Sequence, residues 1–140
     1  MCLLFIAIDT HPEYPLILAG NRDEFYDRPT AGARFWDDAP QVLAGRDLLG
    51  GGTWLGINRE GRWAAVTNFR EPQSAMSQRS RGHLVRDFLL GTTSAEQYAE
   101  RILAGGADYA GFNLLVGDAH QAIHCSNRSS DLSRLQKGVY

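Results

Sequence analysis

The fold is decided by two short apolar runs near the start of the chain, residues 2–8 (CLLFIAI) and residues 16–19 (LILA). The connection between them contains two prolines, and two apolar runs around such a connection are typical of an antiparallel hairpin. A chain that folds back at residue 12 pairs positions whose numbers add up to about 24. Cys2 is therefore expected to lie opposite Arg22.

The second run ends abruptly in four polar residues, Asn21-Arg22-Asp23-Glu24. A cysteine thiol beside a guanidinium and carboxylates is an arrangement suited to nucleophilic chemistry. Ordinary structural roles would explain the same residues, because Asn21 and Asp23 can close a turn by bonding backbone amides. Arg22 and Glu24 can form a simple ion pair, and Cys2 can be a small buried apolar residue. The residues alone leave both interpretations open.

The rest of the chain predicts strands, then two helices, then strands again. Alternating or β-rich runs predict strands at 42–45, 54–57, 63–68, 112–116 and 122–125, with the start of another within 132–140. Helices are expected at 80–90 and at 94–105, and the second opens with a capping-box pattern. Residues 24–40 predict an irregular segment and residues 70–79 an exposed loop.

This order of elements favours an α+β fold in which a helical pair packs on an antiparallel sheet. Both alternating sets of residues 2–8 are apolar, which predicts an inner strand covered above and below. A helix pair covers only one face of a sheet, so the other face requires a second sheet. The pattern therefore predicts antiparallel sheets packed face to face.

Composition excludes several classes of function. The 140 residues carry a net charge of −2, so nothing global favours nucleic acid or an anionic membrane. No apolar run reaches the ~20 residues that span a bilayer, and two cysteines do not make a disulfide framework. We expect a cytoplasmic protein with reduced thiols. Its four histidines lack zinc-ligand spacing, so no metal site is predicted.

Five stretches together resemble one known family. They are Cys2, residues 21–24 (NRDE), 51–56 (GGTWLG), 65–70 (AVTNFR) and 111–115 (GFNLL). The combination is similar to the NRDE family, that of the transport and Golgi organisation 2 proteins. The resemblance implies an N-terminal-nucleophile (Ntn) hydrolase-like fold, in which two antiparallel sheets lie face to face with helices outside each (αββα).

Members of that family are considerably longer than this sequence. In the family the stretch that corresponds to residues 138–140 (GVY) continues into a Gly-Leu-Ser-Asn motif. We therefore expect residues 1–140 to be a single domain of the NRDE type, truncated at its C-terminal end. An incomplete sandwich exposes a sheet edge or an apolar face, which favours a homo-oligomer.

The site can be assigned roles by analogy with N-terminal nucleophiles. Loss of Met1 would leave Cys2 with a free α-amine that acts as general base for its own thiol. Asp23 would orient this amine, and Arg22 would favour the thiolate and hold an anionic group. Asn68 is the candidate donor to an oxyanion. The ligand-binding residues are expected to be Asn21, Glu24 and Arg70.

These roles predict hydrolysis of an amide or thioester through an acyl-enzyme, with a small anionic substrate. The resemblance also implies an alternative without turnover, because relatives are linked to haem trafficking and to lipid or acyl-CoA handling. In that case an apolar pocket between the sheets holds the ligand and arginines meet its carboxylates or phosphates. No resident cofactor is expected, and haem enters only as a carried ligand.

Overall fold

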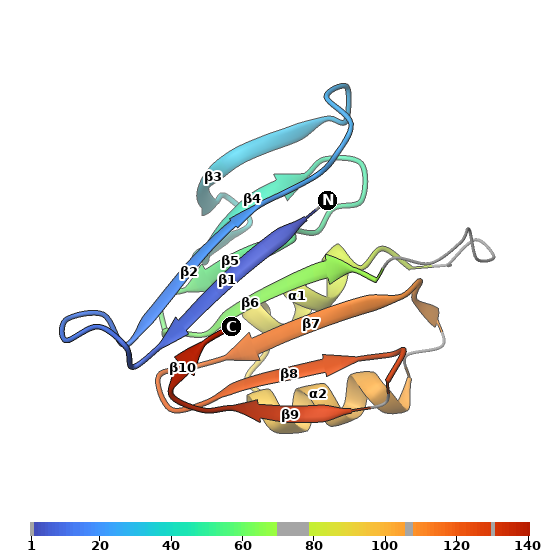
Figure 1. Cartoon of the computed structure of the whole chain (residues 1–140). Helices are drawn as coiled ribbons and strands as arrows, with labels where there is room; N and C mark the ends of the chain where they lie inside the picture. Colours follow the sequence, from blue (N-terminus) through green and yellow to red (C-terminus); the bar gives the residue numbers. More distant parts are fainter. Residues whose placement is uncertain (1, 70–78, 106–107, 130) are drawn as a thin grey trace.

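The computed structural model describes residues 2–69, 79–105, 108–129 and 131–140. Within them ten strands and two helices form an α+β fold with two antiparallel sheets (Figure 1). In chain order the elements are β1 (Leu3–Ile8), β2 (Leu16–Asn21), β3 (Thr30–Trp36), β4 (Ala39–Asp47), β5 (Leu55–Asn58), β6 (Trp63–Asn68), α1 (Gly82–Leu90), α2 (Ala95–Ala104), β7 (Phe112–Gly117), β8 (Ala122–Ser126), β9 (Leu132–Leu135) and β10 (Gly138–Val139).

The first hairpin has the register that the sequence predicts. Leu3 pairs with Asn21 and Ile8 with Leu16, so paired positions add up to 24. The smaller sheet has the order β10-β1-β2, because β10 joins β1 on its other side. The end of the chain is held there by two backbone bonds between Ile6 and Tyr140, at 2.8 and 3.0 Å.

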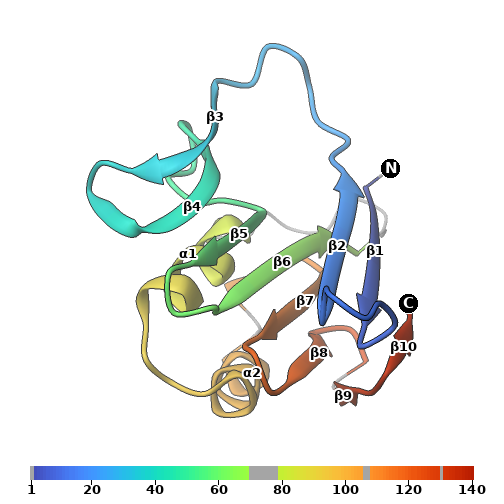
Figure 2. The same cartoon turned by 90° about the vertical axis from the view of Figure 1, so that its left-hand side faces the viewer.

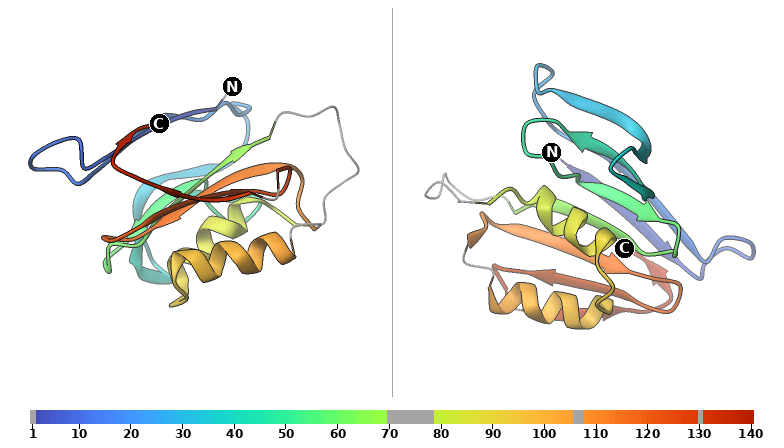
Figure 3. Two further views of the ribbon diagram at one scale, coloured as in Figure 1. Left: turned by 60° about the horizontal axis from the view of Figure 1, so that its bottom comes forward. Right: turned by 180° about the vertical axis from the view of Figure 1, so that it is seen from behind.

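The larger sheet contains β3 to β9 in chain order, each strand antiparallel to the next. The two helices lie in the connection between β6 and β7, and these two strands pair with each other. Both helices pack on the same face of the larger sheet (Figure 2). The smaller sheet lies over the opposite face, so the chain forms three layers (Figure 3). The main core fills the helix-facing side and includes the fully buried Phe88, Leu84, Phe112 and Leu114.

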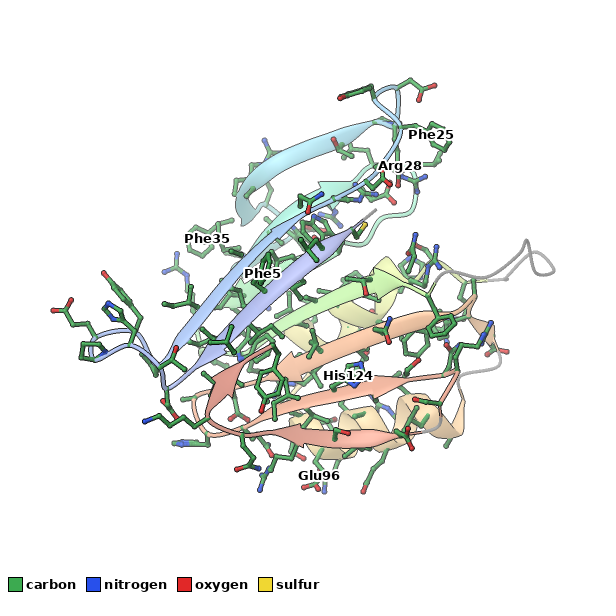
Figure 4. All side chains as sticks on the ribbon, in the orientation of Figure 1. Phe5, Phe25, Arg28, Phe35, Glu96 and His124 are labelled. Atoms are coloured by element: carbon green, nitrogen blue, oxygen red, sulfur yellow. The ribbon has the colours of Figure 1, made fainter. Side chains whose placement is uncertain are left out.

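The expectation that β1 is covered on both faces is wrong for the part of the chain described here. Leu3 and Phe5 are 50% and 54% exposed, whereas Ile6, which points to the larger sheet, is 3% exposed. Phe5 is labelled in Figure 4 on the outer surface of this sheet. Both helices cover the larger sheet, and no described helix lies on the outer face of the smaller one. Continuous apolar sequence therefore predicts the strand correctly but not its burial.

Three further boundaries differ from the predictions. Residues 24–40 are not irregular throughout, because β3 and the start of β4 lie within them. The segment was interpreted as irregular because of Pro29, Gly32 and Pro40. Pro29 lies before β3, Pro40 is the second residue of β4, and no atom lies within 4 Å of a Cβ built on Gly32. The strand expected at 42–45 extends over Ala39–Asp47. The strand expected within 132–140 is two strands that belong to different sheets.

The C-terminal end of α1 is anchored by two buried polar residues of the β5–β6 turn. Asn58 donates from Nδ2 to the carbonyl of Leu89 at 3.0 Å, and its Oδ1 accepts the backbone N–H groups of Glu60 and Arg62. Arg62 donates to the carbonyl of Phe88 and stacks over its ring at 4.0 Å. Asn58 thus supplies a donor to a carbonyl in the last turn of the helix, and Arg62 adds one to the Phe88 carbonyl, which also accepts the N–H of Gly91 at 3.3 Å.

We expect Asn58→Ala to lower the free energy of unfolding by about 2 kcal/mol, because three backbone groups lose their partner and two of these bonds are buried. Urea unfolding followed by circular dichroism measures the change. Glu60→Ala is the matched control, since Glu60 is exposed in the same turn and contributes its backbone rather than its side chain. Equal stability of the two variants would contradict this assignment.

Candidate functional site

The hairpin brings the sulfur of Cys2 to the polar end of β2. The backbone N–H of Asp23 donates to Cys2 Sγ at 3.3 Å. The contact follows from the register, because the residue before Leu3 must meet the residues after Asn21. Cys2 is half-buried rather than sealed in apolar packing.

Cys2 lines a pocket of about 300 Å³ at this end of the molecule. The walls come from the end of the hairpin, from β3 and β4, from the loop before β5, from the end of β6 and from the start of α1. The lining residues are Cys2, Arg22, Asp23, Glu24, Arg28, Thr30, Ala31, Gly45, Arg46, Asp47, Thr53, Trp54, Val66, Asn68, Ser80, Arg81 and Gly82.

The pocket gathers most of the residues predicted from the sequence. Cys2 and Asn68, which are far apart in the chain, both line it, together with residues 22–24. Asn21 is the last residue of β2 and does not line it. Arg70 lies outside the described residues, so its predicted role stays a prediction.

Arg22 and Glu24 form the ion pair that was one of the two interpretations of this stretch. Arg22 Nη2 lies 2.8 Å from Glu24 Oε2, and Glu24 Oε1 accepts the backbone N–H of Phe25 at 3.0 Å. Arg28 Nε lies 3.8 Å from the same carboxylate. The two interpretations are therefore compatible, since residues of the pair also line the pocket.

A second ion pair was missed by sequence reasoning. Arg28 Nη2 donates to Asp47 Oδ2 at 2.7 Å, and Asp47 Oδ1 accepts the backbone N–H groups of Leu49 and Gly50, each at 3.1 Å. Figure 4 labels Arg28 near the end of β1 that carries the N-terminus. The sequence did contain one indication of a role for Asp47: it comes directly before a glycine-rich turn, a position where an aspartate side chain commonly accepts hydrogen bonds from the backbone. Arg28 lay in the segment that was interpreted as irregular.

Opposing effects set the charge state of Asp47. Burial raises the pKa of its carboxyl, but the hydrogen bonds from Arg28 and from the backbone of Gly50 and Leu49 outweigh burial and hold the pKa below its ordinary value. In turn the hydrogen bond to Asp47 raises the pKa of the Arg28 guanidinium. Both groups are charged at neutral pH, and together they tie the segment after β2 to the loop after β4.

We expect Asp47→Asn to lower the free energy of unfolding by about 2 kcal/mol at pH 7, because Arg28 loses a charged partner. The folded pKa of Asp47 lies below the unfolded value of ~3.9, so its contribution is present above that pH and disappears as pH falls through the folded pKa. Urea unfolding at pH 7 and at pH 3 should thus show a smaller difference between variant and wild type at pH 3. Asp37→Asn is the control, since that side chain is 92% exposed; a constant difference would contradict the assignment.

The start of α1 closes one side of the pocket through a close contact between two backbones. A Cβ built on Gly52 would lie 2.4 Å from the carbonyl carbon of Gly82. Thr53 N–H donates to the carbonyl of Gly82 at 3.2 Å, and Arg81 Nη1 donates to the carbonyl of Gly111 at 2.9 Å. Only a residue without a side chain allows the loop before β5 to approach the helix so closely.

The second cysteine provides an internal comparison for the first. Cys125 is fully buried in the core beneath the helices, and burial raises the pKa of its thiol to about 12. It does not line the pocket. Cys2 is therefore the thiol that a solute in the pocket can reach, and Cys125 is the unreactive one.

Two further properties concern the described residues only. Their His, Cys, Asp and Glu side chains form no group of three that could hold a metal ion. Neither helix in this part of the chain has the length and apolar character needed to cross a membrane.

Comparison with known proteins gives a consistent match. A sequence profile described as Transport and Golgi organisation 2 matches residues 1–140. The chain is 43% identical over 125 residues to the Transport and Golgi organization protein 2 homolog of Bos taurus, covering 84% of this chain and 45% of that protein. For the Homo sapiens homolog the identity is 42% over 129 residues, with coverages of 87% and 47%. For the Drosophila melanogaster protein it is 35% over 161 residues, with coverages of 99% and 55%. The chain spans about half the length of these curated relatives.

Proposed function

The chain belongs to the Transport and Golgi organisation 2 family, and on that premise we propose that its Cys2 pocket hydrolyses an amide or thioester bond in a small anionic substrate. The observation that carries the proposal is the position of Cys2 Sγ, which lines a polar pocket and accepts the N–H of Asp23. A nucleophilic sulfur needs access to its substrate and neighbours that hold it in place. The proposed architecture is the Ntn-hydrolase-like αββα arrangement, of which two sheets and one helix layer are described here.

The proposed reaction requires that Met1 be removed, so that Cys2 carries the free α-amine. This amine takes the thiol proton, and the sulfur attacks the substrate carbonyl carbon to form a tetrahedral intermediate. Collapse of the intermediate breaks the bond to the leaving amine or thiol, which takes the proton back from the α-ammonium group. Water activated by the same amine then attacks the acyl-enzyme and releases the carboxylic acid and the free thiol.

The arginines of the pocket support an anionic substrate. Its lining contains four arginines (22, 28, 46 and 81) and three carboxylates (23, 24 and 47). Two of the carboxylates are bound to Arg22 and Arg28. Arg46 is likewise bound to Asp38, which lies outside the lining. An added carboxylate or phosphate would meet the planar guanidinium groups that suit it.

Two donors are proposed for the oxyanion of the intermediate. Asn68 lines the pocket from the end of β6. The other would come from a longer chain, since β10 runs antiparallel to β1 with Ala7 opposite Val139. In a relative that continues the same pairing, the strand would extend toward Cys2, and the fourth residue beyond Tyr140 would reach it. Removal of one donor of this kind typically raises the barrier by ~3 kcal/mol.

Mass spectrometry tests the proposal directly. The purified protein is incubated with a small panel of acyl thioesters that differ in the charge of the acyl group, quenched in acid and digested. The expected result is an acyl group on the peptide that begins at Cys2, with Cys125 unmodified, and an intact mass that lacks one methionine. Retention of Met1 in the isolated protein, or equal labelling of both cysteines, would overturn the proposal.

A carrier without turnover is the second candidate. The observation that favours it is the same pocket, in which a sulfur ligand and several arginines surround about 300 Å³. Such a pocket suits the phosphates of acyl-CoA, and a thiolate can also bind haem iron. Titration with acyl-CoA or haem distinguishes the two candidates: saturable binding, with a Soret shift for haem, and no acyl-enzyme would favour the carrier.

A further inference from the structure

A second cavity of about 480 Å³ lies between the two sheets at the turn end of the first hairpin. Its lining comes from the inner face of the smaller sheet, from the β5–β6 and β7–β8 turns, and from the end of β9. The residues are Ile8, Asp9, Pro15, Leu16, Ile57, Gly61, Trp63, Asp118, Ala119, His120, Gln121, Ala122, Arg134, Leu135, Gln136 and Lys137. We call this cavity the distal slot.

The distal slot is separate from the Cys2 pocket. Along β1 the Cys2 pocket lies at the N-terminal end and the slot at Ile8, and along β6 they lie at Asn68 and at Trp63. No residue lines both. Buried residues lie midway along the two strands, since Ile6 is 3% exposed and Ala65 is fully buried. A ligand in the slot is therefore out of reach of Cys2.

The floor of the slot is one apolar row that crosses five strands of the larger sheet. Neighbouring members are paired from β5 to β9, and the row consists of Ile57, Trp63, Gly117, Ala122 and Leu135. A Cβ built on Gly117 would lie 2.5 Å from the Trp63 indole, so the ring lies against β7 where a side chain would otherwise project. The paired residues Ile8 and Leu16 face this row from the smaller sheet.

The rim carries two cations, Arg134 and Lys137, and two carboxylates, Asp9 and Asp118. Asp118 is engaged within its own turn, where Oδ1 accepts the N–H groups of His120 and Gln121. Arg134 Nη2 donates to the neutral Gln121 Oε1 at 2.7 Å. Lys137 is exposed and has no ion pair among the residues described. The two cations lie on either side of Leu135 in the sequence and border the apolar row. The carboxylates come from other segments, Asp9 from the hairpin and Asp118 from the β7–β8 turn.

We propose that the distal slot binds a medium-chain carboxylate, with its alkyl chain on the Trp63 row and its carboxylate at Arg134 and Lys137. The apolar row removes the chain from water, and the two cations bind the head group. A neutral alcohol would lose the ionic contact, and an alkylammonium ion has the wrong sign of charge for Arg134 and Lys137. This site is independent of the function proposed for Cys2, because neither its location nor its chemistry involves the thiol.

The three tryptophans allow a site-resolved test. Each of three surface hollows contains one of them: Trp54 in the Cys2 pocket, Trp63 in the distal slot, and Trp36 in a hollow on β3–β4. The variant with Trp36→Phe and Trp54→Phe keeps Trp63 as its only tryptophan, which is excited selectively over the five tyrosines at the red edge of absorption. Titration with octanoate should change its emission saturably, with an affinity at least tenfold above that for octanol or octylammonium. Equal responses to the three probes, or no saturable response, would overturn the proposal.

Variants of the rim separate a specific site from general apolar binding. Lys137→Gln and Arg134→Gln should each weaken octanoate binding about fivefold, and Ala122→Leu should weaken it by narrowing the floor. Arg101→Gln, on α2 beneath the other face of the sheet, and Cys2→Ala should leave it unchanged. Circular dichroism shows whether each variant is folded. If Ala122→Leu does not fold, the Lys137→Gln variant still tests the proposal, because Lys137 is exposed and its replacement should not disturb the fold. Unchanged affinity in the Lys137 and Arg134 variants, or loss of affinity in Cys2→Ala, would overturn the proposal.

Discussion

Replacement of Cys2 by alanine is expected to lower kcat/KM for a hydrolysed thioester at least ~1,000-fold, since removal of a covalent nucleophile leaves only binding and oxyanion stabilisation. The sulfur is the atom that lies at the pocket and receives the N–H of Asp23. The fold should be retained, because Cys2 is only half-buried and lies outside the main core. Steady-state hydrolysis with the wild type and the variant, at matched concentration, measures the ratio.

The second thiol supplies the control for this experiment. Cys125→Ala removes a buried core sulfur, so it should cost some stability but leave kcat/KM within about twofold of the wild type. Cys2→Ser adds a finer comparison, since the hydroxyl keeps the geometry and is the weaker nucleophile. If Cys2→Ala retained wild-type activity while Cys125→Ala lost it, the reaction would not use the site proposed here.

The hairpin shows what the sequence could predict and why. Two apolar runs of similar length, joined by a proline-containing turn, admit few registers, and a one-residue slip would reverse every side chain. The predicted register therefore matched the observed pairing of Leu3 with Asn21. Because Cys2 and residues 22–24 extend this pairing, their proximity could also be predicted before the pocket was seen.

Other contacts could not be predicted because they depend on packing between distant segments. Arg28 meets Asp47 only because β3 and β4 form a hairpin, and Pro29, Gly32 and Pro40 concealed that hairpin in the sequence. The same holds for the exposure of Phe5, since apolar sequence does not reveal which layer covers it. The local sequence pattern thus predicts which strands adjacent in the chain pair with each other. The wall of the Cys2 pocket formed by β3 and β4 depends instead on tertiary contacts.

The close contact between Gly52 and the start of α1 predicts a large loss of stability when Gly52 is replaced. We expect Gly52→Ala to lower the free energy of unfolding by about 3 kcal/mol. The new methyl group would lie 2.4 Å from the carbonyl carbon and 2.9 Å from the Cα of Gly82, and neither backbone atom can rotate away. The start of α1 must then move away from Thr53. This movement would disturb the core, because the helix contains the buried residues Leu84 and Phe88.

Three glycine variants with different distances to their neighbours test whether this loss of stability comes from the close contact. Gly82→Ala should cost less than Gly52→Ala, because its nearest contacts to Thr53 are 3.1 and 3.2 Å. Gly32→Ala should be nearly neutral, since no atom lies within 4 Å of its built Cβ. Urea unfolding gives the three stabilities, and the alkylation rate of Cys2 by iodoacetamide reports on the pocket in the same samples. A Gly52→Ala protein as stable as Gly32→Ala, with an unchanged Cys2 alkylation rate, would show that the wall of the pocket does not depend on this contact. A stability loss with an altered alkylation rate would instead link the helix position to the environment of the thiol, because Ser80, Arg81 and Gly82 line the same pocket as Cys2.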